Sequence, residues 1–437
     1  MSPDARTVGR PGGRYLPGAS NHQPLRTKEL AVTNIEHAPL VNMDWRPTPF
    51  EGWTQCMSVK EKERDDPQEG QDPTYFVAHP VSNNLTIIFN RDPNWRGAFL
   101  LNEFTGQIEV RWPWWADRDA WAPKVMHDVD YTRVQDCLGH AYRAEWSPAK
   151  LVPRIEMAAH DNPHHPVVDF LHECHAEWDH KPRLPRLFLD YFGSKAHEAG
   201  RTNLMGVYAI RHMIGAVARV MAPAAKKDEI VILQGEQGAG KSRGIRALCP
   251  DPQWVFDSAL DMNSKDGPAA LRGRWHVEIA ELDSFRKTAM TKVKQFLSLN
   301  EDQYRPPYGR VTITVPRQCV FWGTTNDSHF LQDRTGNRRF WVVPCGVIDV
   351  DGIARDRRQL WGEAMHRYMA GERWHLEGEE ADDQKLAVAD WLDTDPWNEP
   401  IVDWVHGRSD FTTADAYTEA LKGRPDGITR GSEMRIA

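Results

Sequence analysis

The spacing of hydrophobic and polar residues changes four times along the chain. From Leu85, the short apolar runs LTIIF, AFLL and QIEV are separated by turn residues such as Asp-Pro and Thr-Gly. This pattern predicts a small antiparallel β meander within residues 76–130. Residues 131–222 instead show helical spacing, and in LMGVYAIRHMIGAVARVM apolar residues recur at positions i, i+3, i+4 and i+7. A helical region that ends in a packed helix is therefore expected.

Strand-like and helical runs alternate over residues 223–350. EIVILQG, WHVEIAE, CVFWGTT and RRFWVVPC are strand-like, whereas SRGIRALC and MTKVKQFLSL are helical. Such alternation predicts a mostly parallel sheet flanked by helices, the α/β class. Residues 1–75, with the charge run KEKERDDPQEGQDP, are expected to be a flexible arm or linker. Residues 351–437 are expected to be a mainly helical tail, capped at Thr412 or Thr413, with a truncated winged-helix-like segment as one interpretation.

Composition narrows the class of protein. The chain has 437 residues, 40% of them hydrophobic, which is enough to build buried cores. A net charge of -8 argues against a chain coated in nucleic acid but allows a local basic element. The six cysteines lack CxxC spacing, and HDNPHHPVVDFLHECHAEWDH lacks two ligand pairs at zinc spacing, so no structural metal is expected. No apolar stretch approaches the roughly 18 residues of a membrane span, which predicts a cytoplasmic protein without a membrane partner.

The stretch VILQGEQGAGKS matches the pattern GxxxxGK[ST], between a strand-like and a helical run. In such a loop, backbone N–H groups surround phosphates, the lysine contacts the β and γ phosphates, and the hydroxyl ligates Mg²⁺. ATP and Mg²⁺ are therefore the expected cofactors. The predicted nucleotide-binding residues are Gly235, Gln237, Gly238, Ala239, Gly240, Lys241 and Ser242, with Ser242 also a metal ligand.

Acidic residues follow in WHVEIAELD. Acids near the end of a central strand are expected only where they face a site, because such strands are otherwise continuously apolar. Glu281 is the first candidate for the metal-linked acid and water polariser, and Asp283 is the second. Glu278 is equally well explained as a partly exposed strand residue.

Four stretches in order, GEQGAGKS, WHVEIAELDSFRKT, QYRPPYGRVTITVPRQCVFWGTTN and DRTGNRRFWVV, resemble the virulence-associated protein E family. This phage and mobile-element group is related to superfamily 3 helicases. The resemblance extends over residues 76–375 and implies a P-loop NTPase core of the AAA+-like, superfamily 3 type. Many relatives are fused to a primase, which residues 1–75 are too short to form, so a separate primase or replication initiator is an expected partner.

The resemblance also implies roles for later residues. Asn326 matches a polar residue that positions the attacking water, although an ordinary turn former explains it too. In superfamily 3 ATPases an arginine in the region of TGNRRFW reaches the nucleotide site of a neighbouring subunit. Arg338 is the first candidate and Arg339 the second, ahead of Arg334, and the member of the pair that is not used is expected to form a salt bridge within the chain. The active form is then a homo-oligomeric ring, expected to be a hexamer.

The stretch QYRPPYGRVTITVPR predicts a hairpin, because apolar residues alternate with threonines after a tight turn. Ring helicases of this class place a pore loop here. Arg305, Tyr308 and Arg310 cluster at the predicted tip, where arginine neutralises phosphates and tyrosine stacks on a base. A solvated hairpin without a ligand is the alternative.

These features favour a Mg²⁺-dependent ATPase that translocates on or unwinds single-stranded or forked DNA in the replication of a phage, prophage or satellite element. A second hypothesis is a nucleotide-dependent switch or assembly factor in interference between mobile elements, which does not need the hairpin. A third is an ATPase that has lost activity and keeps a structural role.

Overall fold

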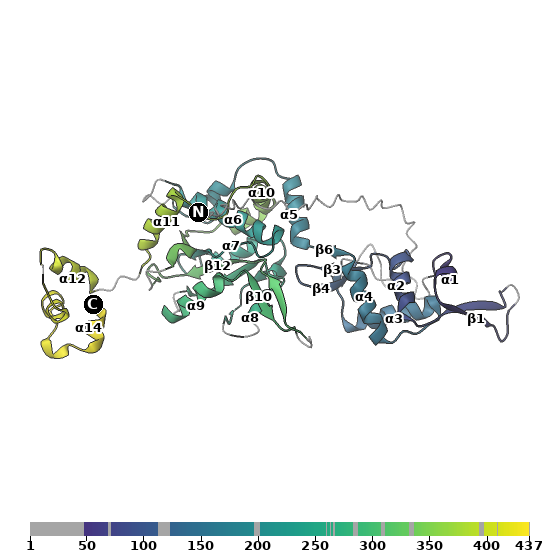
Figure 1. Ribbon diagram of the computed structural model, residues 1–437. Coiled ribbons are helices and arrows are strands. Elements are labelled where there is room, and N and C mark those ends of the chain that lie inside the picture. The colour runs from purple at the N-terminus through teal and green to yellow at the C-terminus, as the bar shows by residue number, and fades with distance from the viewer. Residues whose placement is uncertain are drawn as a thin grey trace, which may run out of the picture.

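The computed structural model describes residues 48–436 except 69–70, 112–122, 196–201, 259, 263, 265–266, 283–286, 307–310, 332–335, 393–396 and 409. An N-terminal module of helices and short strands lies beside a larger α/β core, and a small group of helices at the C-terminus lies on the other side of that core (Figure 1). The site residues predicted from the sequence fall mostly in the core.

The N-terminal module contains two small sheets. One pairs β1 (Val59–Glu63) with β2 (Thr74–Ala78), and the other has the order β5-β4-β3-β6. The strands of the second sheet are β3 (Phe99–Asn102), β4 (Gln107–Val110), β5 (Lys124–Val125) and β6 (Pro163–His164). The helices are α1 (Trp53–Cys56), α2 (Ser82–Arg91), α3 (Asp128–Tyr142) and α4 (Pro148–His160). Their apolar faces share one hydrophobic cluster, so the module has a core of its own.

The predicted β meander is correct in two of its three strands. AFLL and QIEV form the antiparallel pair β3 and β4. LTIIF, however, lies in α2, where Leu85, Ile88 and Phe89 are buried. These three residues have the spacing i, i+3 and i+4, which places them on one face of a helix. A short apolar run satisfies both patterns, so its period did not distinguish a strand from a helix.

The predicted linker is wrong for its last part. The charge run VKEKE is strand β1, and its pairing with β2 sets Lys60 opposite Val77, across the expected boundary between residues 75 and 76. Four of the five β1 residues are exposed, so this strand has no apolar face for a sequence pattern to reveal. Ring contacts help to hold the pair, because the guanidinium groups of Arg64 and Arg143 lie 5.3 and 4.3 Å from the centre of the Tyr75 ring. Residues 1–47 lie outside the described part of the chain.

The core sheet confirms the predicted parallel architecture. Its order is β13-β7-β12-β9-β8, and every pairing is parallel. The strands are β7 (Ile230–Gln234), β8 (Val255–Phe256), β9 (His276–Ile279), β12 (Val320–Thr325) and β13 (Phe340–Pro344). Successive strand residues point to opposite faces, and both faces are covered, which explains why the first four residues of β7, IVIL, are all apolar and buried.

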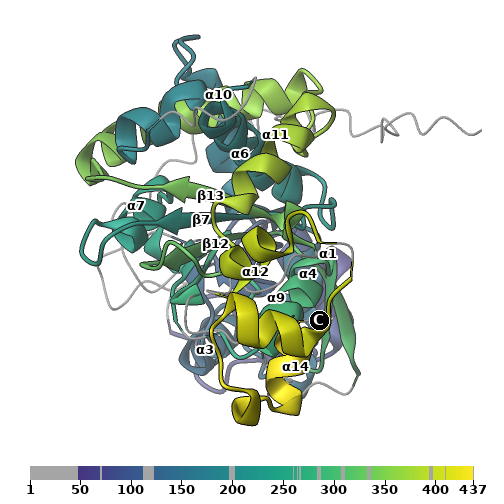
Figure 2. The same ribbon diagram turned by 90° about the vertical axis from the view of Figure 1, so that its left-hand side faces the viewer.

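Helices cover the two faces of this sheet, as Figure 2 shows for β13, β7 and β12. Val231 and Leu233 face a cluster that includes α5 (Pro166–Ala176), α6 (Leu204–Met221) and α10 (Val350–Met369). Ile230 and Ile232 face a second cluster that includes α9 (Lys287–Leu297). Helix α6 is apolar and long enough to cross a membrane, but 78% of it is buried inside the protein, as expected of the predicted packed helix.

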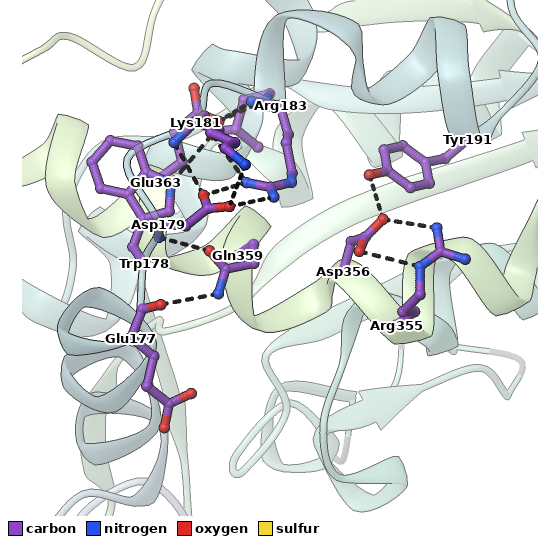
Figure 3. Close-up of polar contacts among 11 residues, drawn as sticks. Glu177, Trp178, Asp179, Lys181, Arg183, Tyr191, Arg355, Asp356, Gln359 and Glu363 are labelled. Carbon is purple, nitrogen blue, oxygen red and sulfur yellow. Dashed lines mark hydrogen bonds and ion pairs between the residues drawn. The ribbon is translucent and has the colours of Figure 1, made fainter.

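A network of polar contacts fixes α10 to residues 177–191 (Figure 3). The carboxylate of Glu363, which is buried, accepts hydrogen bonds from the backbone N–H groups of Arg183 and Leu184 at 2.5 and 2.8 Å. Asp356 accepts from the Tyr191 hydroxyl at 2.9 Å. Because these donors come from one segment, α10 is held in a single position over the sheet.

The C-terminal residues are mainly helical, as predicted. They form α11 (Glu379–Ala389), α12 (Asn398–Val405), α13 (Thr413–Asp415) and α14 (Arg430–Ile436). Thr412, one of the two predicted caps, precedes α13, and its hydroxyl accepts a hydrogen bond from the Asp415 N–H at 3.2 Å. The Asp415 carboxylate accepts in return from the Thr412 N–H at 2.8 Å, which completes a capping box. The winged-helix interpretation of this region stays a prediction.

Two histidines are fully buried where α6 meets the sheet. Burial lowers the pKa of His276 to about 3, and its Nδ1 accepts a hydrogen bond from the Trp322 indole at 2.8 Å. Burial, with help from the charges of Lys227 and His276, also places the pKa of His212 well below its ordinary value. Both side chains are therefore neutral in the folded protein at physiological pH.

Stability should consequently fall on mild acidification. In the unfolded chain these histidines become protonated as the pH falls below about 6.5. In the folded protein they stay neutral down to the lowered pKa of His276, about 3. Each of the two histidines is expected to remove about 1.4 kcal/mol of unfolding free energy per pH unit in this window. Calorimetric unfolding at pH 7.5 and 5.5 measures the loss. In the variant His276→Gln, the unfolding free energy should depend less steeply on pH than in wild type. In the control His79→Gln, which replaces an exposed histidine, the pH dependence should equal that of wild type. Equal stability at both pH values would contradict this account.

Candidate active site

The predicted phosphate-binding loop joins β7 to α7 (Lys241–Leu248) at the carboxyl end of the sheet. Gly238 and Gly240 have φ angles of 85° and 96°, a region that favours glycine, and Gly240 caps the N-terminus of α7. At Gly235, a Cβ atom would lie 2.8 Å from the carbonyl oxygen of Cys345. Each of the three glycines is thus required by the backbone. Between them, Gln237 is exposed and Ala239 is partly buried.

Lys241 is buried and lies against the loop. Its Nζ donates hydrogen bonds to the carbonyl oxygens of Gly235 and Glu236 at 2.6 and 3.0 Å. It also donates to Oδ1 of Asn326 at 2.8 Å, directly after β12. The fold therefore brings together two predicted catalytic residues that are 85 positions apart in the sequence.

Ser242 contacts an acid in the interior of the sheet. Its hydroxyl donates to Oε1 of Glu278 at 2.7 Å, and the hydroxyl of Thr324 donates to the same oxygen at 3.0 Å. Glu278 is 3% exposed and belongs to β9. A buried carboxylate requires such partners, because an unpartnered charge in the interior is costly. The acid nearest to the loop hydroxyl is consequently Glu278.

The interpretation of Glu278 as a partly exposed strand residue is wrong. Strand β9 ends at Ile279, so Glu278 lies within the strand, and its hydrogen bond to Ser242 shows that it points to the face that carries α7. Glu281 lies beyond the strand and is exposed, with a φ of 53°. The catalytic roles of Glu281 and Asp283 stay predictions, and Asp283 lies outside the described residues. The signal for Glu278 was present, since it is an acid inside an otherwise apolar central strand.

Side chains of α10 hold the C-terminal end of α7, the helix that follows the loop. The Arg357 guanidinium donates to the carbonyl oxygens of Ala247 and Cys249 at 3.3 and 2.9 Å, and the Trp361 indole donates to that of Leu248 at 2.7 Å. The last carbonyls of a helix have no partner within it, so these donors satisfy them. The position of Ser242 at the other end of α7 is thereby tied to α10.

The two candidate finger arginines differ in their exposure. Nε of Arg339 lies 3.2 Å from the carboxylate of Asp228, whereas Arg338 lies 3.9 Å from it and its side chain is 73% exposed. Both arginines are thus within ion-pair distance of Asp228, so this contact does not separate them, and the difference is that Arg338 is mostly exposed whereas the Arg339 side chain is 20% exposed. Arg334 lies outside the described residues.

Both arginines lie at the amino-terminal end of the parallel strands, whereas the loop lies at their carboxyl-terminal end. They directly precede Phe340, which pairs with Ile230 at the start of β7, while the loop follows Gln234 at its end. Five strand residues span about 16 Å. Neither arginine is therefore placed beside Lys241 of its own chain.

The predicted hairpin is present. Strands β10 (Glu301–Tyr304) and β11 (Ile313–Pro316) are antiparallel, with Tyr304 opposite Ile313. Arg305 follows β10 and is exposed, whereas Tyr308 and Arg310 lie outside the described residues. Val311, the first of the apolar residues that alternate with threonines, precedes β11 and is 67% exposed.

A buried ion pair anchors the base of the hairpin. The Arg317 guanidinium donates twice to the carboxylate of Asp302, each time at 2.8 Å, and once to the Phe296 carbonyl at 2.5 Å. Two parallel bonds of this kind define orientation as well as distance. The hairpin is thus joined to the end of α9, a feature that the sequence analysis did not identify.

A known protein family matches the part of the chain that contains this site. The model of the virulence-associated protein E-like domain matches residues 171–390, half of the chain. The chain therefore belongs to this family, as the sequence motifs predicted.

Distantly similar solved structures include those of the NrS-1 C terminal region. The apo structure of the NrS-1 C terminal region has a TM-score of 0.41 and 11% identity, covering 77% of this chain and 81% of that one. Its A form apo structure has a TM-score of 0.40 and 10% identity, covering 75% and 80%. No curated protein matches the chain.

Proposed function

We propose that this protein is a Mg²⁺-dependent ATPase of the P-loop, superfamily 3 type, which acts as an oligomeric ring to translocate on or unwind DNA in replication of a phage, prophage or satellite element. The observation that carries the proposal is the group formed by Lys241, Ser242 and Glu278 at the end of the glycine loop. Membership in the virulence-associated protein E-like family supports the same conclusion.

The residues at the loop fit a nucleotide-bound Mg²⁺. Hydroxyl and carboxylate oxygens are the ligands that this ion prefers, and Ser242 and Glu278 supply one of each, 2.7 Å apart. Among the described residues, Glu278 is held by hydroxyl donors and by no ion pair, so its negative charge is not already neutralised by a side chain. We propose that these two residues hold the ion, which supplies charge neutralisation at the β and γ phosphates.

The chain's own groups then perform the remaining tasks. Phosphate oxygens replace the carbonyls of Gly235 and Glu236 as partners of Lys241, and the loop N–H groups hold the phosphates. When Lys241 turns to the phosphates, its hydrogen bond to Asn326 breaks, and the side chain of Asn326 is then free to orient the attacking water. Glu281 follows β9 at the same edge of the sheet and is the candidate to accept the proton of that water.

The exposed Arg338 supports a shared site. Because it lies at the opposite edge of the sheet from its own loop, it can act at a nucleotide only if that nucleotide belongs to another subunit. A head-to-tail interface repeated by rotation closes into a ring, and each Arg338 then completes its neighbour's site. We propose a homohexamer with single-stranded or forked DNA in its channel.

Mixing two inactive variants tests the shared site. Lys241→Ala removes phosphate binding, and Arg338→Ala removes the arginine supplied to the neighbour, so each alone should lose at least about a hundred-fold in ATP hydrolysis. When equal amounts are mixed, about a quarter of the interfaces combine an intact lysine with an intact arginine, and a similar share of activity should return. Steady-state phosphate release measures both results.

The matched control is Arg355→Ala mixed with Lys241→Ala, because Arg355 is a similarly exposed arginine on α10. Arg355→Ala alone should remain active. If the Arg338→Ala protein keeps full activity, or if its mixture with Lys241→Ala stays inactive, the shared site is wrong.

Substitutions in the hairpin separate the motor from the nucleotide-dependent switch. Replacing Arg305 and Arg310 with alanine removes two phosphate contacts, so DNA-stimulated hydrolysis and unwinding of a fork should fall about ten-fold or more while hydrolysis without DNA is retained. The control is Lys60→Ala with Lys62→Ala, on exposed β1. Survival of both DNA-dependent activities in the hairpin variant would overturn the role assigned to the hairpin, whereas a wild-type protein that hydrolyses ATP but unwinds no fork would favour the switch.

A further inference from the structure

A wide groove separates the N-terminal module from the core. Among the contacts that join its walls, the rings of Phe104 and Trp254 lie 6.0 Å apart and His165 is hydrogen-bonded to Gln318 at 2.9 Å. The turn between β3 and β4 also packs on Arg272 and Gly273. Beside this junction the groove has a volume of about 1220 Å³. Figure 1 shows β3 and β4 on the side of the module that faces the core. A pocket for a small ligand is commonly about 300–1,000 Å³, so the groove suits an extended ligand.

The arginines that line the groove contact uncharged groups, whereas the acid Glu109 is held by a histidine and an amide. Among the described residues, neither Arg272 nor Arg274 is paired with a carboxylate. Arg274 donates to backbone carbonyls, Arg272 donates to the Tyr304 hydroxyl at 3.4 Å, and the buried Nε of Arg272 has no hydrogen-bond partner. Glu109, in contrast, accepts hydrogen bonds from His164 at 2.9 Å and Asn102 at 2.6 Å.

The other lining acid and lysine are also accounted for. Asp251 accepts a hydrogen bond from the N–H of Gln253 at 2.8 Å. Lys124 extends from β5 and lies 3.1 Å from the carboxylate of Asp130. Among the lining residues that the structure describes, the two arginines are thus the cations whose charge no carboxylate balances, which is notable in a chain of net charge -8. An anionic ligand would satisfy them.

Aromatic side chains complete the wall. Trp254 and Tyr304 both line the groove, and both are partly exposed. Rings of this kind stack on unpaired bases in sites that bind single strands without sequence preference. Tyr304 is also the last residue of β10, and Arg305 follows it into the hairpin. The groove therefore leads to the element expected to contact DNA.

We propose that this groove binds single-stranded DNA, with Arg272 and Arg274 on its phosphates and Trp254 and Tyr304 against its bases, and that it leads the strand to the hairpin. This inference rests on the proposed function, because it adds an entry site to the same motor.

Charge removal tests the groove directly. The variant Arg272→Gln with Arg274→Gln should bind an oligothymidylate about ten-fold more weakly than wild type near physiological salt. The slope of log affinity against log salt should fall by about 1.4, because each phosphate contact to a single strand contributes roughly 0.7. Hydrolysis of ATP without DNA should stay unchanged, since both arginines lie away from the nucleotide loop. Lys60→Gln with Lys62→Gln, on β1, is the matched control and should retain affinity and slope.

Cross-linking gives a second measurement on the unaltered protein. An oligothymidylate that carries thiothymidine, irradiated with wild-type protein, should attach to peptides containing residues 251–254, 272–274 or 304. Three results would each overturn the proposal that the groove binds single-stranded DNA. They are unchanged affinity and salt slope in the arginine variant, cross-links confined to other peptides, and tighter binding of a duplex than of a single strand.

The same experiments distinguish the groove from the motor. Single-strand binding at the groove by a protein that hydrolyses no ATP would retain the groove and overturn the proposed function. DNA-stimulated hydrolysis that is unaffected by the arginine substitutions would retain the motor and overturn the groove.

Discussion

The carboxylate of Glu278 lies inside the parallel sheet, where an unpartnered charge would cost several kcal/mol. The hydroxyl groups of Ser242 and Thr324 satisfy it, and Ser242 can do so only if α7 begins directly over β9. That position depends in turn on the glycine backbone before α7 and on the hydrogen bonds that α10 makes to its far end. One buried acid thus constrains the loop, the helix and the strand order around it.

The direction of the strands imposes a second constraint. In a parallel sheet every strand ends at the same edge, so Lys241 and Asn326 converge there without being close in sequence. The same geometry sends Arg338 to the opposite edge, where its side chain is exposed. A chain built in this way contains both halves of the proposed catalytic site, but it holds them apart. In the proposed ring, the halves are brought together by neighbouring copies of the chain.

Local features of the fold could be predicted from the sequence, and features that depend on distant residues could not. The loop between β7 and α7 was predicted because its glycines, strand and helix are contiguous. LTIIF was assigned to a strand because a short apolar run fits either period, and β1 was missed because four of its five residues are exposed. The choice between Glu278 and Glu281 required the end of β9, which spacing alone did not define.

The groove could not be predicted from sequence patterns for a related reason. Arg272 and Arg274 stand in an unremarkable stretch, LRGRW, and become significant only because the β3–β4 turn lies across from them. Likewise, the contact between Asp302 and Arg317 depends on the register of the hairpin. Residues brought together by pairing or by packing of two modules leave no periodic signal in either segment.

Electron paramagnetic resonance of Mn²⁺, used in place of Mg²⁺ with bound ADP, tests the central role of Glu278 most directly. The account predicts that Glu278→Gln weakens Mn²⁺ binding at least about ten-fold, while Glu281→Gln retains it. Tight binding by Glu278→Gln together with its loss in Glu281→Gln would contradict the account.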